Sequence, residues 1–251
     1  MIPITLDRHN SVHWLKFGST ELWRVIKALV VGAQGRELAV TRHVERTARK
    51  GDPESVIASM DAFAKERRFL MNVGAEKGDI LVDQLVSVRA NRVLELGAYC
   101  GYSAVLMGAC LKRTGGQLIS LEASERNAEL ARRVVDHAGL SSVVDIQVGS
   151  ASDLIKGLDG AFDAVFIDHW KDDYLSDLRQ LEELNLLRPG ARIVADNVGI
   201  FSKTLEPYLD YVRTSKHMES EHFPTRMEYS EDIADGVEVS IWRGPSSQLA
   251  A

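Results

Sequence analysis

The sequence predicts an α/β fold in which helices cover both faces of a mostly parallel sheet. Two observations predict it. From about residue 92, short β-branched runs alternate with longer runs of helical spacing, a rhythm typical of parallel strands joined by crossover helices. Late in the chain, the turn dipeptide Asp235-Gly236 indicates a meander that adds an antiparallel strand. The seven expected strands are Arg92–Leu96, Gln117–Leu121, Val143–Val148, Ala164–Ile167, Arg192–Ala195, a segment around Met227–Tyr229, and Val237–Trp242.

The chain before the first expected strand is predicted to be helical. Asp52 and Pro53 supply an N-cap and a first-turn proline, and apolar residues then recur at helical spacing to about Phe69. Residues 21–31 form a shorter amphipathic pattern, which we expect to pack against the domain rather than to contact a membrane. We therefore divide the chain into an N-terminal helical extension, residues 1–45, and one larger domain, residues 46–251.

Composition narrows the class of protein. The 251 residues carry a formal net charge of −6, which disfavours a nucleic-acid-binding surface. Only two cysteines occur, Cys100 and Cys110, too few for a disulfide framework, so a reducing compartment is indicated. No apolar run approaches the length of a membrane span, and residues 1–8 lack the pattern of a signal peptide. We expect a cytoplasmic protein whose partner is a small molecule.

Acidic residues follow directly on two of the expected strands. Asp168 comes after Ala164–Ile167, and Asp196 and Asn197 come after Arg192–Ala195. If these strands are parallel neighbours, their carboxyl ends bring three oxygen ligands into the crevice where open α/β sheets bind ligands. Oxygen ligation suits a hard cation such as Mg²⁺. We predict a Mg²⁺ site formed by these three residues.

A loop with two glycines joins the first expected strand to a helix. Its small residues let the backbone approach a ligand, but the spacing Gly97-x-x-x-Gly101 is not the dinucleotide fingerprint. Glu122, at the end of the next strand, can accept two hydrogen bonds from a ribose diol, and Glu95 would lie near a cationic part of the ligand. Because the loop has no basic residue to hold a phosphate, the pattern favours S-adenosylmethionine over a nucleotide.

Four segments together resemble the catechol O-methyltransferase family: Leu94–Val105, Ile167–Asp172, Ala195–Val198 and Met71–Gly74. The resemblance extends from about Gly51 to Pro245. It implies a Rossmann-like class I methyltransferase fold with a mostly parallel seven-stranded sheet. It also implies Mg²⁺-dependent transfer of a methyl group from S-adenosylmethionine to one hydroxyl of a catechol, and a monomer.

The resemblance further implies a set of cofactor-binding residues. Met71 would lie near the sulfonium, Tyr99 and Ser103 near the methionine moiety, and Ser152 and His169 near the adenine. The implied cofactor-binding set is Met71, Val73, Glu95, Gly97, Tyr99, Ser103, Glu122, Ser152, Asp168 and His169.

Two residues are expected to act on the substrate. A divalent cation disfavours the charged form of a neighbouring lysine, so Lys171, three residues after Asp168, is predicted to be the general base. Glu228 aligns with the family's carboxylate that hydrogen-bonds the hydroxyl left unmethylated. Phe69 and Trp170 are candidate aromatic walls that exclude water. The expected substrate-binding set is Phe69, Trp170, Lys171, Asn197, Phe201 and Glu228.

Two alternatives remain open at this point. A cation-dependent O-methyltransferase of the caffeoyl-CoA type shares the metal chemistry and an Asp-x-x-Lys-x-x-Tyr run that Asp168, Lys171 and Tyr174 satisfy. Trp170 and the segment Met71–Val73 favour the catechol branch. From a different class, the chain could be a cofactor-binding regulatory module that has lost catalysis, which the retention of every predicted ligand disfavours.

Overall fold

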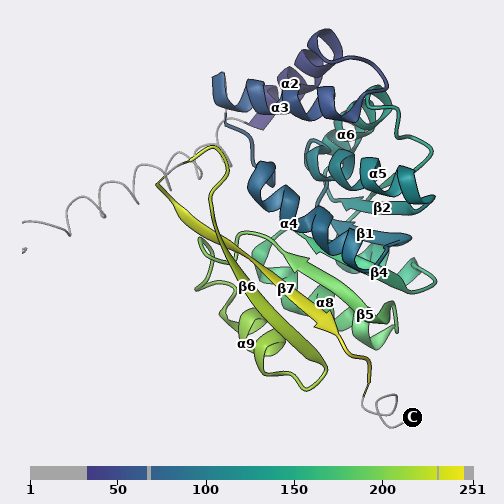
Figure 1. Ribbon diagram of the computed structural model, residues 1–251, viewed down its shortest axis with the longest axis vertical. Coiled ribbons are helices and arrows are strands. Elements are labelled where there is room, and N and C mark those ends of the chain that lie inside the picture. Colours follow the sequence, from purple (N-terminus) through teal and green to yellow (C-terminus); the bar gives the residue numbers. More distant parts are fainter. Residues whose placement is uncertain (1–32, 67–68, 231, 246–251) are drawn as a thin grey trace, which may run out of the picture. The chain divides into compact units, whose positions relative to one another are not determined.

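The computed structural model describes residues 33–66, 69–230 and 232–245 (Figure 1). The chain divides into two compact units, Met1–Ala39 and Val40–Ala251. The described part of the first unit is the beginning of helix α2 (Ala33–Thr47). The amphipathic helix expected for residues 21–31 lies outside the described residues.

The second unit is built on a seven-stranded sheet with the strand order β3-β2-β1-β4-β5-β7-β6. The strands are β1 (Arg92–Leu96), β2 (Gln117–Glu122), β3 (Val144–Val148), β4 (Phe162–Ile167), β5 (Leu187–Ala195), β6 (Met218–Arg226) and β7 (Ala234–Trp242). Strands β1 to β5 pair in parallel, whereas β7 is antiparallel to both β5 and β6. The predicted α/β fold, with a mostly parallel sheet and an antiparallel C-terminal strand, is confirmed.

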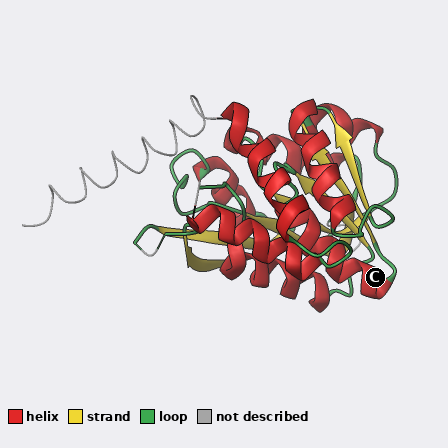
Figure 2. Cartoon of the chain, turned by 90° about the horizontal axis from the view of Figure 1, so that it is seen from above, coloured by secondary structure: helices red, strands yellow, loops and turns green. Residues whose placement is uncertain are grey.

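Helices cover both faces of this sheet (Figures 1 and 2). One layer contains α4 (Gly74–Ser87), α5 (Tyr102–Thr114) and α6 (Glu125–His137), with α3 (Pro53–Glu66) packed against α5. The other contains α7 (Ala151–Leu154), α8 (Tyr174–Glu183) and α9 (Glu206–Thr214), and two short 3₁₀ turns, η1 (Ile155–Gly157) and η2 (Lys171–Asp173), precede strand β4 and helix α8. Among the helices of the described residues, none combines the length and the apolar character that a bilayer span requires.

The N-cap expected for α3 is confirmed. Asp52 Oδ1 accepts a hydrogen bond from the backbone N–H of Ser55 at 3.0 Å, and the helix begins at Pro53. This carboxylate satisfies one of the orphan donors of the first helical turn.

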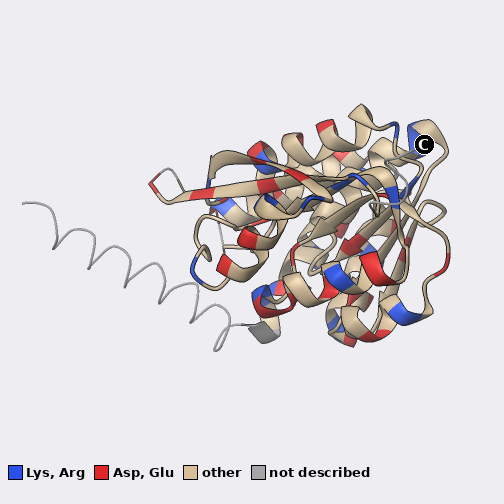
Figure 3. Cartoon of the chain, turned by 90° about the horizontal axis from the view of Figure 1, so that it is seen from below, with Lys and Arg blue, Asp and Glu red and all other residues tan. Residues whose placement is uncertain are grey.

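Along the elements of the described residues, Lys and Arg positions are interspersed with Asp and Glu positions (Figure 3).

The central strands are buried on both faces because their sequences are nearly continuous apolar runs. On the face toward α8 and α9, residues from β1, β2, β4, β5, β6 and β7 form one hydrophobic cluster with both helices. The strand residues of this cluster are Leu94, Leu96, Leu121, Phe162, Val165, Ile167, Leu187, Ala191, Ile193, Ala195, Met218 and Trp242. Because both faces are packed, a ligand can approach the central strands only at their ends.

The expected position of the sixth strand is wrong. The strand is Met218–Arg226, and Met227–Tyr229 instead begins the turn that leads to β7. Pro224 argues against a strand in the sequence, but β6 lies at the edge of the sheet, where proline is tolerated. The dipeptide Asp235-Gly236 is likewise not a turn, since both residues pair with β6 inside β7.

Candidate active site

The two predicted aspartates follow strands that are neighbours in the sheet. Strands β4 and β5 pair in parallel with Ile167 opposite Ala195, and the backbone N–H of Asp196 donates to the carbonyl of Ile167 at 3.1 Å. Asp168 and Asp196 therefore leave the sheet side by side at its carboxyl edge. Burial raises the pKa of Asp196, and the charge of Asp168 adds to this effect. The structure thus brings the two carboxylates together.

The atoms at this edge fit a hard cation. Asp196 is 1% exposed, and its Oδ2 atom is buried without a hydrogen-bond partner. Asn197 adopts a left-handed conformation, with a φ of 60°, and donates its side-chain Nδ2 to Asp235 Oδ2 at 3.2 Å, so its side-chain oxygen is available to another partner. Within the described residues no three His, Cys, Asp or Glu side chains are arranged to hold a metal, so a cation here would need the amide oxygen of Asn197 as well as the aspartates.

Lys171 lies between the ends of the same two strands. It begins the 3₁₀ turn η2, and its Nζ atom donates to Asp168 Oδ1 at 2.9 Å and to the hydroxyl of Tyr174 at 2.6 Å. Tyr174 in turn donates to the carbonyl of Asp196 at 3.2 Å. The Nζ atom also lies 5.6 Å from the centre of the Phe201 ring. The predicted base, one predicted ligand and one predicted substrate residue are therefore close together.

A buried lysine without a recognisable sequence motif, Lys77, also lies at this site. Lys77 of α4 is 1% exposed, and its Nζ atom lies 2.8 Å from Asp196, 3.1 Å from Glu228 and 2.6 Å from Asp235. Burial alone would lower the pKa of Lys77, but the three carboxylates outweigh burial and raise it. One signal could have found it: Lys77 lies on the buried stripe of α4, between Gly74 and Leu81.

Glu228 reaches the site from the turn after β6. Its side chain is 6% exposed, and burial raises the pKa of its carboxyl while Lys77 opposes the shift. A Cβ atom at Gly74 would lie 2.9 Å from Glu228 Cβ, so the glycine allows the turn to approach the beginning of α4. The two predicted catalytic residues therefore pair with different charged groups of this site. Lys171 pairs with Asp168, and Glu228 pairs with Lys77, which also pairs with Asp196.

The two predicted aromatic walls are placed differently. The ring of Phe69 meets the ring of Tyr229 edge to face, with centroids 6.3 Å apart, so it lies beside the residue that follows Glu228. Trp170 is 69% exposed and directly precedes Lys171. A side chain this large and apolar in solvent is available to cover a ligand bound at the edge of the sheet.

The glycine loop lies at the ends of β1 and β2. Gly97 has a φ of 101°, and a Cβ atom there would lie 2.7 Å from the carbonyl oxygen of Asp168, so only glycine lets β1 and β4 end this close together. Glu122 accepts hydrogen bonds from the backbone N–H groups of Ala98 at 3.2 Å and Tyr99 at 2.9 Å. The carboxylate predicted to bind a ribose therefore also fixes the loop.

Glu95 is fully buried beneath this loop. The hydroxyls of Ser103 and Ser120 each donate to its carboxylate. Burial raises the pKa of Glu95 to about 7, although both serines oppose the shift. A buried carboxyl of this kind favours a cationic partner, because that partner stabilises the charged form.

The remaining predicted cofactor residues come from three segments of the chain. His169 stacks on Tyr174 with ring centroids 5.3 Å apart, and its Nε2 atom pairs with Asp177 Oδ2 at 2.7 Å, whereas its buried Nδ1 atom has no partner. Met71 and Val73 immediately precede α4. Ser152 is exposed in α7, which follows β3. His169 and Ser152 thus lie on segments that follow β4 and β3, and Met71 and Val73 lie on the segment that leads into α4.

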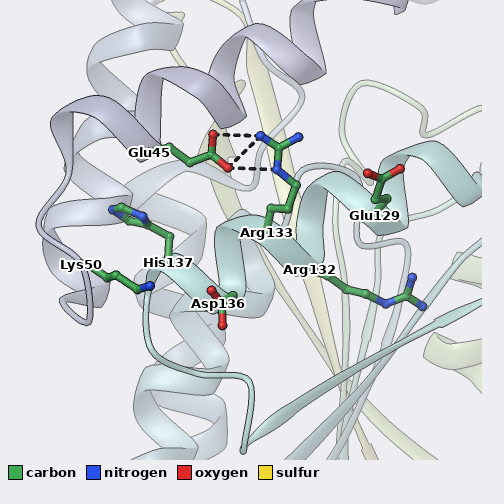
Figure 4. A pocket seen from close by; sticks show the side chains of 7 residues that line it. All are labelled: Glu45, Lys50, Glu129, Arg132, Arg133, Asp136 and His137. Atoms are coloured by element: carbon green, nitrogen blue, oxygen red, sulfur yellow. Dashed lines mark hydrogen bonds and ion pairs between the residues drawn. The ribbon is translucent and has the colours of Figure 1, made fainter.

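A surface cavity of about 470 Å³ lies elsewhere, along α6 and the end of α2 (Figure 4). Its lining contains none of the predicted site residues: it consists of Glu45, Lys50, Glu129, Arg132, Arg133, Asp136 and His137. In this lining Arg133 pairs with Glu45 at 2.7 Å. The cavity is therefore separate from the candidate site at the sheet edge.

Comparison with known proteins supports the observed fold and shows the family. The model of the O-methyltransferase family matches residues 49–241. A catechol O-methyltransferase of Mus musculus is 38% identical over 94% of this chain and 88% of its own length, and one of Bos taurus is 39% identical over 90% and 83%. The crystal structure of an O-methyltransferase from Bacillus cereus in complex with SAH has a TM-score of 0.63 and 21% identity, and covers 88% of this chain and 97% of its own.

Proposed function

The chain belongs to the O-methyltransferase family, and from this premise we propose that it transfers the methyl group of S-adenosylmethionine to one hydroxyl of a catechol, with Mg²⁺ as metal cofactor. One observation carries the proposal. The register of β4 and β5 puts Asp168 and Asp196 side by side, with Lys171 bound to the first and Asn197 following the second. The relatives named catechol O-methyltransferase support a catechol as the substrate.

S-adenosylmethionine would bind along the ends of β1, β2 and β4. In this proposal Glu95 faces the cationic part of the cofactor, which would stabilise the ionised form of a carboxyl whose pKa is raised by burial. Glu122 accepts hydrogen bonds from the ribose hydroxyls, in addition to those from the backbone N–H groups of the glycine loop. The other proposed contacts are Met71, Val73, Gly97, Tyr99, Ser103, Ser152, Asp168 and His169.

Asp168, Asp196 and Asn197 would hold the Mg²⁺ ion. The unpartnered Oδ2 atom of Asp196 supports this assignment, because a buried carboxylate oxygen requires a partner. When bound, Mg²⁺ supplies the positive charge that lowers the pKa of a nearby phenolic hydroxyl.

The side chains around the ion carry out the remaining steps of the proposed mechanism. Lys171 accepts the proton of the hydroxyl that will be methylated, and Glu228 accepts a hydrogen bond from the other hydroxyl. Phe69, Trp170 and Phe201 cover the ring and exclude water. Because attack on a methyl carbon needs oxygen, carbon and sulfur in line, holding this geometry supplies most of the rate enhancement.

A labelled-methyl assay tests the proposal. The protein, Mg²⁺, a simple catechol and S-adenosylmethionine with a labelled methyl group should give labelled product. Chelation of the metal should abolish turnover while calorimetry still detects binding of S-adenosylmethionine. Turnover only with coenzyme A esters would instead favour the caffeoyl-CoA type of enzyme, and binding without turnover on any diol would favour a regulatory module.

Three further properties complete the proposal. Residues 46–251 form the catalytic domain, and residues 1–45 form a helical extension to it. The enzyme acts as a monomer in the cytoplasm. Gel filtration at the concentration of the assay and cell fractionation measure these last two properties directly.

A further inference from the structure

Lys77 is a fixed positive charge at the centre of three carboxylates that come from three different parts of the chain. Its Nζ atom lies 2.8 Å from Asp196 after β5, 3.1 Å from Glu228 in the turn after β6, and 2.6 Å from Asp235 in β7. The lysine itself comes from α4 and is 1% exposed. One ammonium group therefore ties a proposed metal ligand to the proposed substrate anchor.

Asp235 extends this connection to Asn197. Its Oδ2 atom accepts from both Lys77 and the side-chain Nδ2 of Asn197, and its Oδ1 atom accepts from the backbone N–H groups of Gly199 and Ile200 at 3.1 and 3.0 Å. These bonds fix the left-handed conformation of Asn197 and the orientation of its amide. Lys77 and Asp235 thus support the loop that carries two of the three proposed ligands.

The two oxygens of Asp196 are unequal because of Lys77. Oδ1 faces the ammonium group at 2.8 Å and accepts from the backbone N–H of Asn197 at 2.6 Å, whereas the buried Oδ2 atom has no partner. With Oδ1 held in this way, Oδ2 is the atom left for a cation. The three carboxylates around Lys77 form no metal site in their present arrangement, but without the lysine they would lack a balancing positive charge, which a divalent cation could supply.

We propose that Lys77 is a positioning residue: it orients Asp196 and Glu228, and it fills the position on which Asp196, Glu228 and Asp235 converge, so that a divalent cation cannot enter there. This inference rests on the proposed function. Glu228 remains available to a substrate hydroxyl, and the metal is confined to the side of Asp196 that faces Asp168. Lys77 pairs with Asp196, Glu228 and Asp235, none of them in the glycine loop, so binding of the cofactor at that loop should not depend on the lysine.

The substitution Lys77→Met tests the proposal, since it keeps the length of the side chain and removes its charge. We expect Mn²⁺ titrations followed by electron paramagnetic resonance to give one ion per wild-type chain and two per variant chain. The KM for catechol should rise at least about tenfold, because a charged hydrogen bond to Glu228 is lost. The Kd for S-adenosylmethionine should stay within about twofold, which general damage to the fold would not allow.

Two further variants separate this role from a purely structural one. Arg213→Met removes an arginine of α9 whose guanidinium pairs at 2.7 Å with the buried Glu238, a residue of β7 like Asp235. This variant should lower stability without changing the KM for catechol or the number of Mn²⁺ ions bound. Lys77→Met combined with Asp235→Asn keeps the wild-type net charge and is measured in parallel in case the single variant does not fold. It should show the same rise in KM.

A single Mn²⁺ site in Lys77→Met, or a wild-type KM for catechol in either Lys77 variant, would overturn the proposal while the proposed function stands. Wild-type protein that neither binds Mn²⁺ nor methylates a catechol would overturn the proposed function, and this inference with it.

Discussion

Glu95 is expected to make the binding of S-adenosylmethionine depend on pH. The carboxyl is completely buried, and burial raises its pKa to about 7. A cationic ligand group binds the ionised form, so the cofactor must displace the proton. At pH 6 about one tenth of the molecules are ionised at this residue, and the apparent affinity should be about tenfold lower than at pH 8.

The same shift has a consequence for the stability of the protein without cofactor. Because the pKa rises from 4.5 to about 7 on folding, the folded state keeps this proton to higher pH than the unfolded chain does. The free energy of unfolding should therefore fall as the pH rises through this window. The contribution of this one group is about 3 kcal/mol by pH 8.

Calorimetric titration of S-adenosylmethionine at pH 6, 7 and 8 measures the effect on binding, and two buffers of different ionisation enthalpy report the released proton. Glu95→Gln, which keeps the shape of the side chain, should bind more weakly and with little dependence on pH. Its free energy of unfolding should also fall less than that of the wild type between pH 5 and 8. A wild-type affinity that is constant from pH 6 to 8, or an equal slope in Glu95→Gln, would refute this reasoning.

Three other substitutions test separate parts of the site. Lys171→Met should lower kcat by a factor of about 10² or more while the Kd for S-adenosylmethionine stays unchanged, and equal losses in both would contradict its role as a base. Gly97→Ala should lower the free energy of unfolding in urea by about 2 kcal/mol or more, since its φ of 101° is strained for alanine and the new Cβ would lie 2.7 Å from the carbonyl oxygen of Asp168. An unchanged urea midpoint would show that β1 and β4 can separate without cost. Tyr174→Phe removes a hydroxyl that accepts from Lys171 and donates to Asp196, and it should cost about 1 kcal/mol of stability and lower kcat; wild-type kcat would mean that Asp168 alone positions the lysine.

The sequence identifies the edge of the sheet that carries the chemistry because two signals reinforce each other there. Apolar runs mark the central strands, and an acidic residue directly after such a run must lie at a strand end. The sequence therefore predicts that Asp168 and Asp196 lie together if their strands are parallel neighbours, and the structure confirms that β4 and β5 are. Their register follows from the burial of β4 and β5 on both faces, since a slip would expose the apolar side chains.

Lys77 could not be assigned to the site in the same way. Its three partners lie far along the chain: Asp196 is 119 residues after Lys77, and Asp235 is 158 residues after it. A lysine in a helix is usually solvated, and only its place on the apolar stripe of α4 distinguishes it. Long-range pairing of charges is a tertiary effect, and the pattern of one helix does not encode the partner.

The sequence-based predictions for the C-terminal strands are wrong for a different reason. Pro224 and the dipeptide Asp235-Gly236 have strong local preferences for turns, yet both lie inside paired strands. The edge position of β6 removes the penalty for proline, and the buried bonds of Asp235 to Lys77 and to the loop after β5 outweigh its preference for a turn. Tertiary contacts therefore stabilise a strand conformation at these positions against the local preference for a turn.

The central claim is that Asp168, Asp196 and Asn197 hold one divalent cation beside the methyl donor. The most direct measurement is a crystal structure of the protein with Mn²⁺, a non-reactive analogue of S-adenosylmethionine and a catechol inhibitor, with the metal located by anomalous scattering. We expect one anomalous peak in contact with oxygen atoms of all three residues and of the catechol. A peak bound elsewhere, or these three side chains directed away from one another in a complex that contains both ligands, would contradict the claim.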